Sequence, residues 1–420
     1  MLDIKFIREN QDVVKDAIRK KFVKLDLDEL IALDDRRREA LQLVESLRAE
    51  QKRISEGMAG PLEAEAREKL LAELRPLKEH VGQKEEELRT LMADWQALML
   101  QVPNIPDMTV PEGASDKENQ EWKTWGEKTQ FDFDAKDHVE IMTRLGMVDF
   151  ERGTKVHGFR GYFLIGDGAL LCFAIWRYAL DFFTKKNFSL VLPPAIVRKQ
   201  NLYITGHLPG DVEDYYMTQD GDALAGTAEV PIMGMHAEEI FAPGELPKRY
   251  LGFSPCFRRE AGSYSKDVKG LIRVHEFFKF EQVVLSEASH ETSVKLHEEL
   301  NRNTEEFIES LDIPYRTVIN CAGDLGLGQV KKYDIELWVP KEETYREISS
   351  ASYFHDFQTR RAGIRYRDES GTMRYAHSLN STAVPTPRVL VSLIENCQEA
   401  DGRVRVPEVL RPYFGKEYIG

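Results

Sequence analysis

The segments CFRREAG at 256–262 and RVHEFFKFE at 273–281 decide the fold of this chain. Each is typical of a strand, and the loop of Gly, Ser and Lys residues between them predicts a β-hairpin with a long tip. Alternation along the first strand places Arg258 and Glu260 on one face. Alternation along the second collects a mixed set on one face: Arg273, His275, Phe277, Lys279 and Glu281. Such a surface suits a charged ligand with a planar part, although a solvated edge hairpin would alternate charge in the same way.

Two short segments carry further polar groups. Thr227 and Glu229 would point the same way from a strand, and a hydroxyl beside a carboxylate can hold an ammonium group. Glu347 together with Ser349, or with Ser350 if the strand ends there, offers hard oxygens that suit Mg²⁺ near a phosphate. Taken singly, either segment also fits a purely structural strand end.

A helix start is predicted after the segment LNSTAVPTPR at 379–388. Thr386 is the expected N-cap, Pro387 the first helical residue, and Arg388 lies in the first turn. An arginine at a helix start attracts anions and can stack on a flat base. An ordinary capped helix with an exposed arginine would show the same pattern.

The first hundred residues predict a long helical hairpin. Apolar residues recur at spacings of three and four over two stretches that include Leu30, Val44 and Ile54, then Leu74 and Val81. Gly60 is expected to end the first helix and Pro61 to lie in the first turn of the second. Pro76 falls inside the second pattern and is expected to kink that helix or delay its start.

Beyond the linker of Pro103, Pro106 and Pro111, short strand-like runs alternate with helical ones. This pattern predicts an α+β fold built on an antiparallel sheet. We therefore expect two domains, an N-terminal one at 1–102 that carries the hairpin at about 27–98, and a second at 103–420.

Composition excludes several classes of protein. The chain has 420 residues, of which 42% are hydrophobic and 30% charged, so it is neither disordered nor a disulfide scaffold. Its net charge of −14 argues against broad, sequence-blind nucleic-acid binding, and any such surface would be local. The four cysteines lie far apart, the start of the chain is too charged for a secretory signal, and no apolar run could span a bilayer. A cytoplasmic protein without a membrane partner is expected.

Taken together and in this order, the segments resemble those of the bacterial seryl-tRNA synthetases, which are class II aminoacyl-tRNA synthetases. The resemblance covers nearly the whole chain. Pro193 and Pro194 close a stretch like motif 1, the hairpin resembles motif 2, and the run ending at Arg388 resembles motif 3. Six short sequence motifs typical of these synthetases occur in the expected order: TAEVP, FRREAG, GLIR, YREISS, DFQTRR and VRVPEVLRPY.

The resemblance implies a six-stranded antiparallel catalytic sheet in a homodimer, with the motif 1 strand at the dimer interface. It implies an ATP-dependent ligase in protein biosynthesis that converts L-serine to seryl-adenylate and transfers the seryl group to the 3′ end of serine tRNA. The resemblance leaves open whether selenocysteine tRNA is a further acceptor. Neither DNA nor a membrane is an implied partner. Neither step obviously demands a protein nucleophile, so catalysis would rest on positioning and charge neutralisation.

The resemblance also implies residue roles. Arg258, Glu260 and Arg388 are the implied catalytic residues, of which Arg258 bridges the α-phosphate and the serine carboxylate. Thr227, Glu229, Glu281 and Thr382, with Arg258, are the implied serine-binding residues. The ATP-binding set comprises Arg258, Arg259, Glu260, Val274, Phe277, Glu347, Ile348, Ser349, Ser350 and Arg388. Glu347 and Ser350 are the implied Mg²⁺ ligands.

The hairpin is expected to grip the tRNA by its shape and backbone. The candidate phosphate contacts on its first helix are Arg36, Arg37, Arg38, Arg48, Lys52 and Arg53. A solvated charged face with ion pairs between neighbouring turns would look the same in sequence. Two alternatives to the synthetase remain open: a synthetase-like paralogue, acting as an amino acid:carrier-protein ligase or as an inactive regulator, and a coiled-coil assembly protein.

Overall fold

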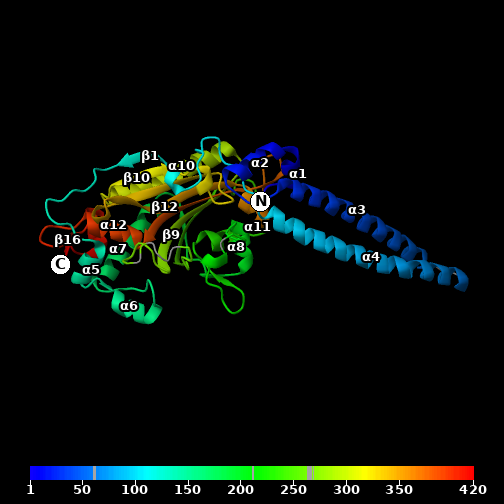
Figure 1. Ribbon diagram of the computed structural model, residues 1–420, viewed down its shortest axis with the longest axis horizontal. Helices are drawn as coiled ribbons and strands as arrows, with labels where there is room; N and C mark the ends of the chain where they lie inside the picture. The colour runs from blue at the N-terminus through cyan, green and yellow to red at the C-terminus, as the bar shows by residue number, and fades with distance from the viewer. Residues whose placement is uncertain (60–62, 211, 263–266, 268) are drawn as a thin grey trace. The chain divides into compact units, whose positions relative to one another are not determined.

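The computed structural model describes residues 1–59, 63–210, 212–262, 267 and 269–420 (Figure 1). The chain divides into two compact units. One unit spans Leu2–Pro103, and the other comprises Asn104–Gly420 together with Met1. Among the described residues, no helix combines the length and the apolarity that crossing a membrane requires.

The smaller unit is helical. Two short helices, α1 (Ile4–Glu9) and α2 (Gln11–Lys20), precede two long ones, α3 (Leu27–Gly57) and α4 (Ala64–Met99). Asp26 caps α3, since its side chain accepts hydrogen bonds from the backbone amides of Asp28 and Glu29. Helix α3 has 31 residues and α4 has 36. At a rise of 1.5 Å per residue they are about 46 and 54 Å long.

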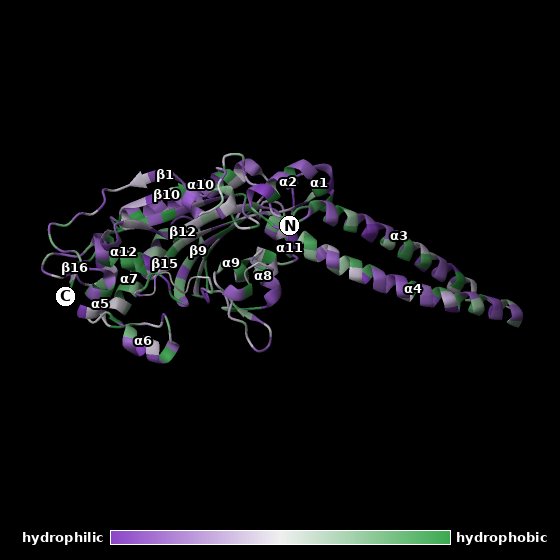
Figure 2. Cartoon of the chain, viewed as in Figure 1, coloured by the Kyte–Doolittle hydropathy of each residue, from purple (hydrophilic) through white to green (hydrophobic). Residues whose placement is uncertain are grey.

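The two long helices lie side by side and confirm the predicted helical hairpin (Figure 1). Leu30, Val44 and Ile54 of α3 are buried, as are Leu74 and Val81 of α4. Hydrophilic residues dominate the rest of both helices (Figure 2). A narrow apolar seam between otherwise polar helices is the packing of an antiparallel coiled coil.

Two details of the hairpin prediction have different outcomes. Gly60 and Pro61 lie outside the described residues. Pro76 does not delay the second helix, which begins at Ala64 and continues through Pro76. Neighbouring turns and the seam therefore hold α4 together across the missing backbone donor.

The larger unit is built on an eight-stranded sheet (Figure 1). In spatial order its strands are β1 (Gln120–Trp125), β10 (Tyr315–Ile319), β11 (Lys331–Val339), β12 (Thr344–His355), β15 (His377–Thr386), β9 (Glu276–Ser286), β8 (Lys248–Phe257) and β4 (Ser189–Val191). All pairs are antiparallel except β4 with β8. The six antiparallel strands implied by the family are those from β10 to β8, and β1 and β4 extend the sheet.

The helices that pack on this sheet include α7 (Asp167–Thr184), α10 (His290–Ser310) and α12 (Arg388–Asn396). Helix α10 packs along β12 and β15, and α12 along β11 and β15. From Lys279 onward β9 is buried at every position, because both faces of the sheet are covered there. Such a strand positions side chains rigidly, which suits a binding site.

The remaining elements are short. The helices are α5 (His138–Arg144), α6 (Phe150–His157), α8 (Lys199–Thr205), α9 (Glu229–Met235), α11 (Phe357–Ala362) and α13 (Arg411–Phe414). The strands are β2 (Val148–Asp149), β3 (Phe163–Leu164), β5 (Ile196–Val197), β6 (Ala223–Leu224), β7 (Ile240–Phe241), β13 (Arg365–Arg367), β14 (Met373–Tyr375), β16 (Val404–Arg405) and β17 (Tyr418–Ile419).

An aromatic cluster joins α7 to α10. Phe307 of α10 is fully buried, and its ring centroid lies 5.3 Å from that of Tyr178 and 5.7 Å from that of Phe183.

We predict that Phe307→Ala lowers the free energy of unfolding by about 3–5 kcal/mol, since it removes a ring and leaves a cavity. Chemical denaturation followed by circular dichroism measures this. Trp122→Ala, at a ring that is 60% exposed, is the control and should change stability far less; equal losses would contradict the packing role.

Candidate active site

Two adjoining cavities lie where β8, β9, β12 and β15 meet. The first, of about 260 Å³, is lined by side chains that include Phe277, Lys279, Ser350 and Thr382. The second, of about 360 Å³, is lined by side chains that include Thr227. Five residues line both: Arg258, Glu260, Arg273, Glu347 and Arg388. The four sequence segments that carried polar candidates therefore converge on one place.

Arg258 lies one residue beyond the end of β8, so it is not part of a strand as the alternation predicted. Its backbone amide donates to the carbonyl of His275 at 2.9 Å, which fixes the chain as it leaves the sheet. Its guanidinium lies 5.6 Å from the centre of the Phe277 ring. No described carboxylate pairs with this guanidinium. A cation next to an aromatic face, without an internal anion, is suited to an anionic ligand with a flat group.

Glu260 is held at the cavity by Arg273. The residue has a φ of 55°, a left-handed conformation that turns its side chain back from the line of β8. Its carboxylate pairs with the Arg273 guanidinium at 2.5 Å, and Arg273 also contacts Asp267 at 3.3 Å. Arg273 and His275 precede β9 rather than belonging to it, and His275 instead contacts His157 at 3.0 Å. Arg259 is exposed and is not among the described residues that line the two cavities.

Glu347 and Ser350 face the first cavity together with Ile348. They do so because of a β-bulge rather than a strand end: the pairing of β11 with β12 shifts between Ser349 and Glu347. Ser349 is buried and donates to the carbonyl of Thr382 at 2.5 Å. Of the two pairings left open by the sequence, the bulge selects Glu347 with Ser350.

Arg388 is the first residue of α12. Its Nε donates to the carbonyl of Ile272 at 3.0 Å and its Nη1 to the carbonyl of Glu347 at 2.7 Å. The predicted cap is wrong by one residue, since Thr386 ends β15 and Pro387 takes the N-cap position. Two backbone oxygens thus hold the guanidinium at the cavity wall.

A buried polar cradle of Thr227, Glu229, Glu281 and Thr382 adjoins the cavities. Thr382 lines the first cavity and Thr227 the second, whereas Glu229 and Glu281 are not among the residues that line either. Thr227 and Glu229 do not lie on a strand, because Glu229 is the first residue of α9 and Thr227 precedes it. They nevertheless lie together, and the Glu229 amide donates to Thr227 Oγ1 at 3.3 Å. Thr382 Oγ1 donates to Glu281 Oε2 at 3.3 Å, joining β15 to β9. All four side chains are at least nine-tenths buried.

Burial raises the pKa of the Glu229 carboxyl to about 7, and the negative charge of Glu281 acts in the same direction. The Lys279 ammonium and a hydrogen bond from Gln358 act against this rise. Gln358 Nε2 donates to Glu229 Oε1 at 2.6 Å, and Ser378 Oγ donates to Gln358 Oε1 at 2.7 Å. The carboxylate is therefore held in a fixed orientation and changes charge near neutral pH.

Two further residues contact the cradle, and the sequence alone assigned neither of them a function. Lys279 was placed on the correct face of β9 but was given no function, and Gln358 appeared only within the word DFQTRR. The alternation of β9 could have identified Lys279, since it lies between Phe277 and Glu281 on one face. No local signal could have identified Gln358, because its partners Thr205, Glu229 and Ser378 are distant in sequence.

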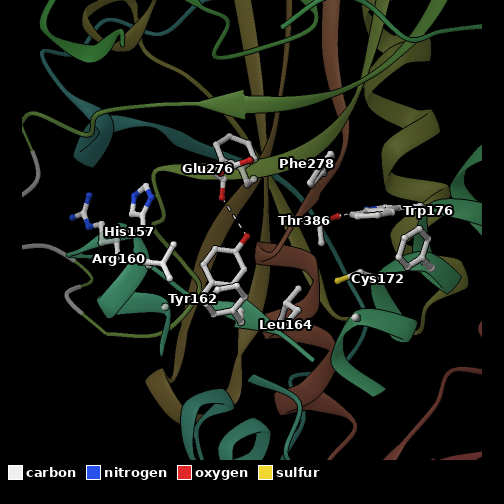
Figure 3. A pocket seen from close by; sticks show the side chains of 16 residues that line it. His157, Arg160, Tyr162, Leu164, Cys172, Trp176, Glu276, Phe278 and Thr386 are labelled. Carbon is white, nitrogen blue, oxygen red and sulfur yellow. Dashed lines mark hydrogen bonds between the residues drawn. The ribbon is translucent and has the colours of Figure 1, made fainter. Parts of the chain in front are cut away.

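A third cavity, of about 380 Å³, lies beside the first and shares Phe277 and Thr386 with it. Its wall comes from α6, α7 and the start of β9 (Figure 3). Tyr162 donates its hydroxyl to the carbonyl of Glu276 at 3.2 Å, and Trp176 Nε1 donates to Thr386 Oγ1 at 2.8 Å. The surrounding surface is apolar, and Phe173 is 59% exposed.

The basic candidates of α3 fall into two groups. Arg37 pairs with Asp34 at 2.7 Å, Arg48 with Glu85 at 2.6 Å and Lys52 with Glu56 at 3.8 Å. Three others are exposed and have no described ion-pair partner: Arg36, Arg38 and Arg53. Arg37 also stacks on Trp95, with its Cζ atom 4.6 Å from the ring centre. Arg37 and Arg48 therefore have roles within the hairpin.

Comparison with known proteins accounts for both units. Residues 1–106 match the model of the seryl-tRNA synthetase N-terminal domain, and residues 215–397 match that of the tRNA synthetase class II core domain (G, H, P, S and T). A serine–tRNA ligase from Deinococcus radiodurans is 47% identical over 422 residues, which cover 100% of this chain and 99% of the relative. This chain belongs to the seryl-tRNA synthetase family.

Solved structures agree with this assignment. The seryl-tRNA synthetase of Pyrococcus horikoshii, complexed with ATP, matches with a TM-score of 0.90 at 38% identity, over 100% of this chain and 99% of that one. The cytoplasmic serine–tRNA ligase of Naegleria fowleri, in complex with AMP, matches with a TM-score of 0.86 at 33% identity, over 100% and 98% of the two chains. Nothing in these comparisons supports the carrier-protein ligase, the inactive regulator or the assembly protein.

Proposed function

We propose that this chain is a serine–tRNA ligase that joins L-serine to ATP, giving seryl-adenylate and pyrophosphate, and then transfers the seryl group to the 3′ end of serine tRNA. The proposal rests mainly on one observation: a site suited to an anionic, planar ligand lies next to a site suited to a small polar ammonium ligand. Arg258 and Phe277 provide a cation beside an aromatic face, and the cradle of Thr227, Glu281 and Thr382 provides hydroxyls beside a carboxylate.

The site supports a division of roles along the ligand. Arg388, held by two backbone carbonyls, and Phe277 are suited to the two faces of the adenine ring. Glu260 and the backbone of Val274 lie on the wall where the edge of the base would be read. Arg258 is suited to hold the serine carboxylate against the α-phosphate, since its guanidinium has no described internal anion.

The first step then needs alignment more than acid–base chemistry. The serine carboxylate attacks the α-phosphorus, a bond forms from its oxygen to phosphorus, and pyrophosphate leaves. Arg258 would neutralise charge on the phosphoryl oxygens as that bond forms, which is electrostatic stabilisation by a preorganised group. In the second step the terminal adenosine hydroxyl of the tRNA attacks the acyl carbon, and AMP leaves.

Glu347 and Ser350 fit a magnesium ion by their chemistry. A carboxylate and a hydroxyl are hard oxygen donors, and Mg²⁺ ordinarily takes few protein ligands and completes its shell with water and phosphate. No described cluster of three His, Cys, Asp or Glu residues forms a closed metal site. When bound, the ion would supply positive charge to the phosphates of ATP.

The apolar surface around α7 supports a homodimer as the working form. Leu170 and Phe173 of α7 are 54% and 59% exposed, and Leu192, next to the motif 1 prolines, is 71% exposed. Large apolar side chains exposed to this degree are typical of an interaction surface. We assign this surface to a second copy of the chain, in line with the motif 1 resemblance.

Serine-dependent exchange between ATP and pyrophosphate tests the first step. Wild-type protein should show exchange with serine and with no other of the twenty amino acids, and Arg258→Ala should lower the rate on the order of 10³-fold or more, because it removes charge stabilisation at phosphorus. Arg152→Ala, at an exposed arginine paired with Asp149, is the control and should be unaffected. Wild-type protein that gives no exchange with any amino acid would contradict the proposed activity.

The pKa of Glu229, raised to about 7 by burial, predicts the pH dependence. A protonated Glu229 no longer adds its negative charge beside the Glu281 carboxylate that receives the serine ammonium, so kcat/KM for serine should fall as the pH drops below about 7, by at most about tenfold per pH unit. Burial and the Arg258 and Lys279 charges hold the pKa of His207 near 4, outside this range. Initial rates between pH 5.5 and 8.5 provide the measurement.

Glu229→Gln should remove this titration and leave a flat, lower profile, because the amide cannot change charge. The KM for ATP, measured over the same pH range, is the internal control. A wild-type profile that stays flat between pH 5.5 and 7 would refute the role of Glu229.

The exposed arginines of α3 predict a defect confined to tRNA charging. The triple variant Arg36→Glu, Arg38→Glu and Arg53→Glu should raise the KM for serine tRNA at least about tenfold, because each reversal replaces a phosphate contact by repulsion. Exchange with serine should stay at the wild-type rate. A matched variant on α4, Lys69→Glu, Arg75→Glu and Lys78→Glu, changes the same charge at exposed positions. Equal effects of the two variants would show a general charge effect and count against α3 as the contact face.

A further inference from the structure

Lys279 occupies the cradle that the proposed function reserves for serine. Its Nζ atom donates to Thr227 Oγ1 at 3.2 Å and to Thr382 Oγ1 at 3.3 Å. It also forms an ion pair with the Glu281 carboxylate. The Lys279 side chain is only 6% exposed and that of Glu281 only 3%. A protein ammonium group thus makes the contacts expected of the substrate ammonium.

The charge of Glu281 explains why a cation must be there. A carboxylate this deeply buried is strongly destabilised without a partner, and Lys279 is the cation in contact with it. Serine brings an ammonium of its own to the same carboxylate. Two ammonium groups cannot share so small a cradle, so the arrival of serine must displace Lys279.

The geometry of β9 indicates where Lys279 goes. Phe277, Lys279 and Glu281 point to one face of the strand at successive steps of about 7 Å. Phe277 lies at the end where Arg258 approaches, and Glu281 lies at the end joined to Thr382. Lys279 stands between them, at the level where the serine carboxylate must meet the α-phosphate. Its flexible four-carbon stem allows the ammonium to turn from one end toward the other.

We propose that the serine zwitterion inserts into the Lys279–Glu281 ion pair. The serine ammonium takes over the Glu281 carboxylate and the two threonine hydroxyls, and the freed Lys279 ammonium pairs with the serine carboxylate opposite Arg258. This inference rests on the proposed function and adds Lys279 to its substrate-binding residues.

The exchange leaves no charge of the internal ion pair without a partner once serine is bound. Glu281 then faces the serine ammonium, and Lys279 and Arg258 face the serine carboxylate, so the number of buried charges on the protein is unchanged. A ligand with an ammonium but no carboxylate would displace Lys279 and give it no anion in return. The mechanism therefore selects for a complete zwitterion, a property that the cradle without Lys279 would lack.

The test compares L-serine with serinol, in which a second hydroxymethyl group replaces the carboxylate. Dissociation constants for both are measured by calorimetry on the full-length wild-type protein and on Lys279→Met. Loss of a buried charge partner should weaken serine binding on the order of 30-fold or more. Serinol should bind Lys279→Met as well as or better than wild type, because no lysine has to be displaced. The preference for serine over serinol should therefore collapse.

The control variant is Lys248→Met, at a β8 lysine that pairs with Glu245 away from the cavities and is not part of the site. It should bind both ligands as wild type does. Lys279→Arg keeps the charge and should recover much of the preference for serine. If Lys279→Met weakens the binding of serine and of serinol equally, the role of Lys279 is purely structural and the proposal is overturned. Unchanged binding of serine by Lys279→Met also overturns it.

A second variant decides the matter if Lys279→Met does not fold, as judged by circular dichroism. Glu281→Gln removes the partner of the ammonium, which both ligands carry, so both should bind on the order of 30-fold or more weakly. Loss of serine binding with intact serinol binding in this variant overturns the proposal. Wild-type protein without serine-dependent exchange would instead overturn the proposed function, so the two failures are distinguishable.

Discussion

The antiparallel pairing of β8, β9 and β15 is the constraint on which the site depends. In this pairing Phe277 lies opposite Cys256, and Glu281 lies between Gly252 and Thr382. Because strand register fixes every side chain on both strands, a slip of one residue would turn Phe277, Lys279 and Glu281 away from the cavity together. The helices on both sides of the sheet hold this register by burying the rest of β9.

Irregularities in the sheet position the groups that regular strands could not. A bulge in β12 brings Glu347 and Ser350, three residues apart, to the same cavity, and a bulge in β15 occurs between Thr382 and Val384. β8 ends at Phe257, so Arg258 and Glu260 project from a turn beyond the sheet. Bulges and strand ends at a site re-aim side chains without changing the surrounding core.

The carboxylates of the site have charged or polar partners both without and with substrate. The carboxylates of the site, two of them buried and Glu260 partly buried, are tolerated because each has a partner: Gln358 for Glu229, Lys279 for Glu281 and Arg273 for Glu260. While no substrate is present, the Lys279 ammonium itself occupies the cation position of the cradle. Binding then exchanges internal contacts for contacts with the ligand, which costs less than creating a charged cavity for each turnover.

The amino-acid sequence by itself determined the helical hairpin, the α+β class and the family, because heptad spacing, strand alternation and ordered motif words are local properties of the chain. It also placed Phe277, Lys279 and Glu281 on one face. Only the tertiary structure decided that Glu347 and Ser350 line the same cavity, that Glu229 begins a helix, and that Gln358 and Lys279 complete the cradle. Those features depend on bulges and on contacts between residues far apart in sequence, and no local pattern encodes them.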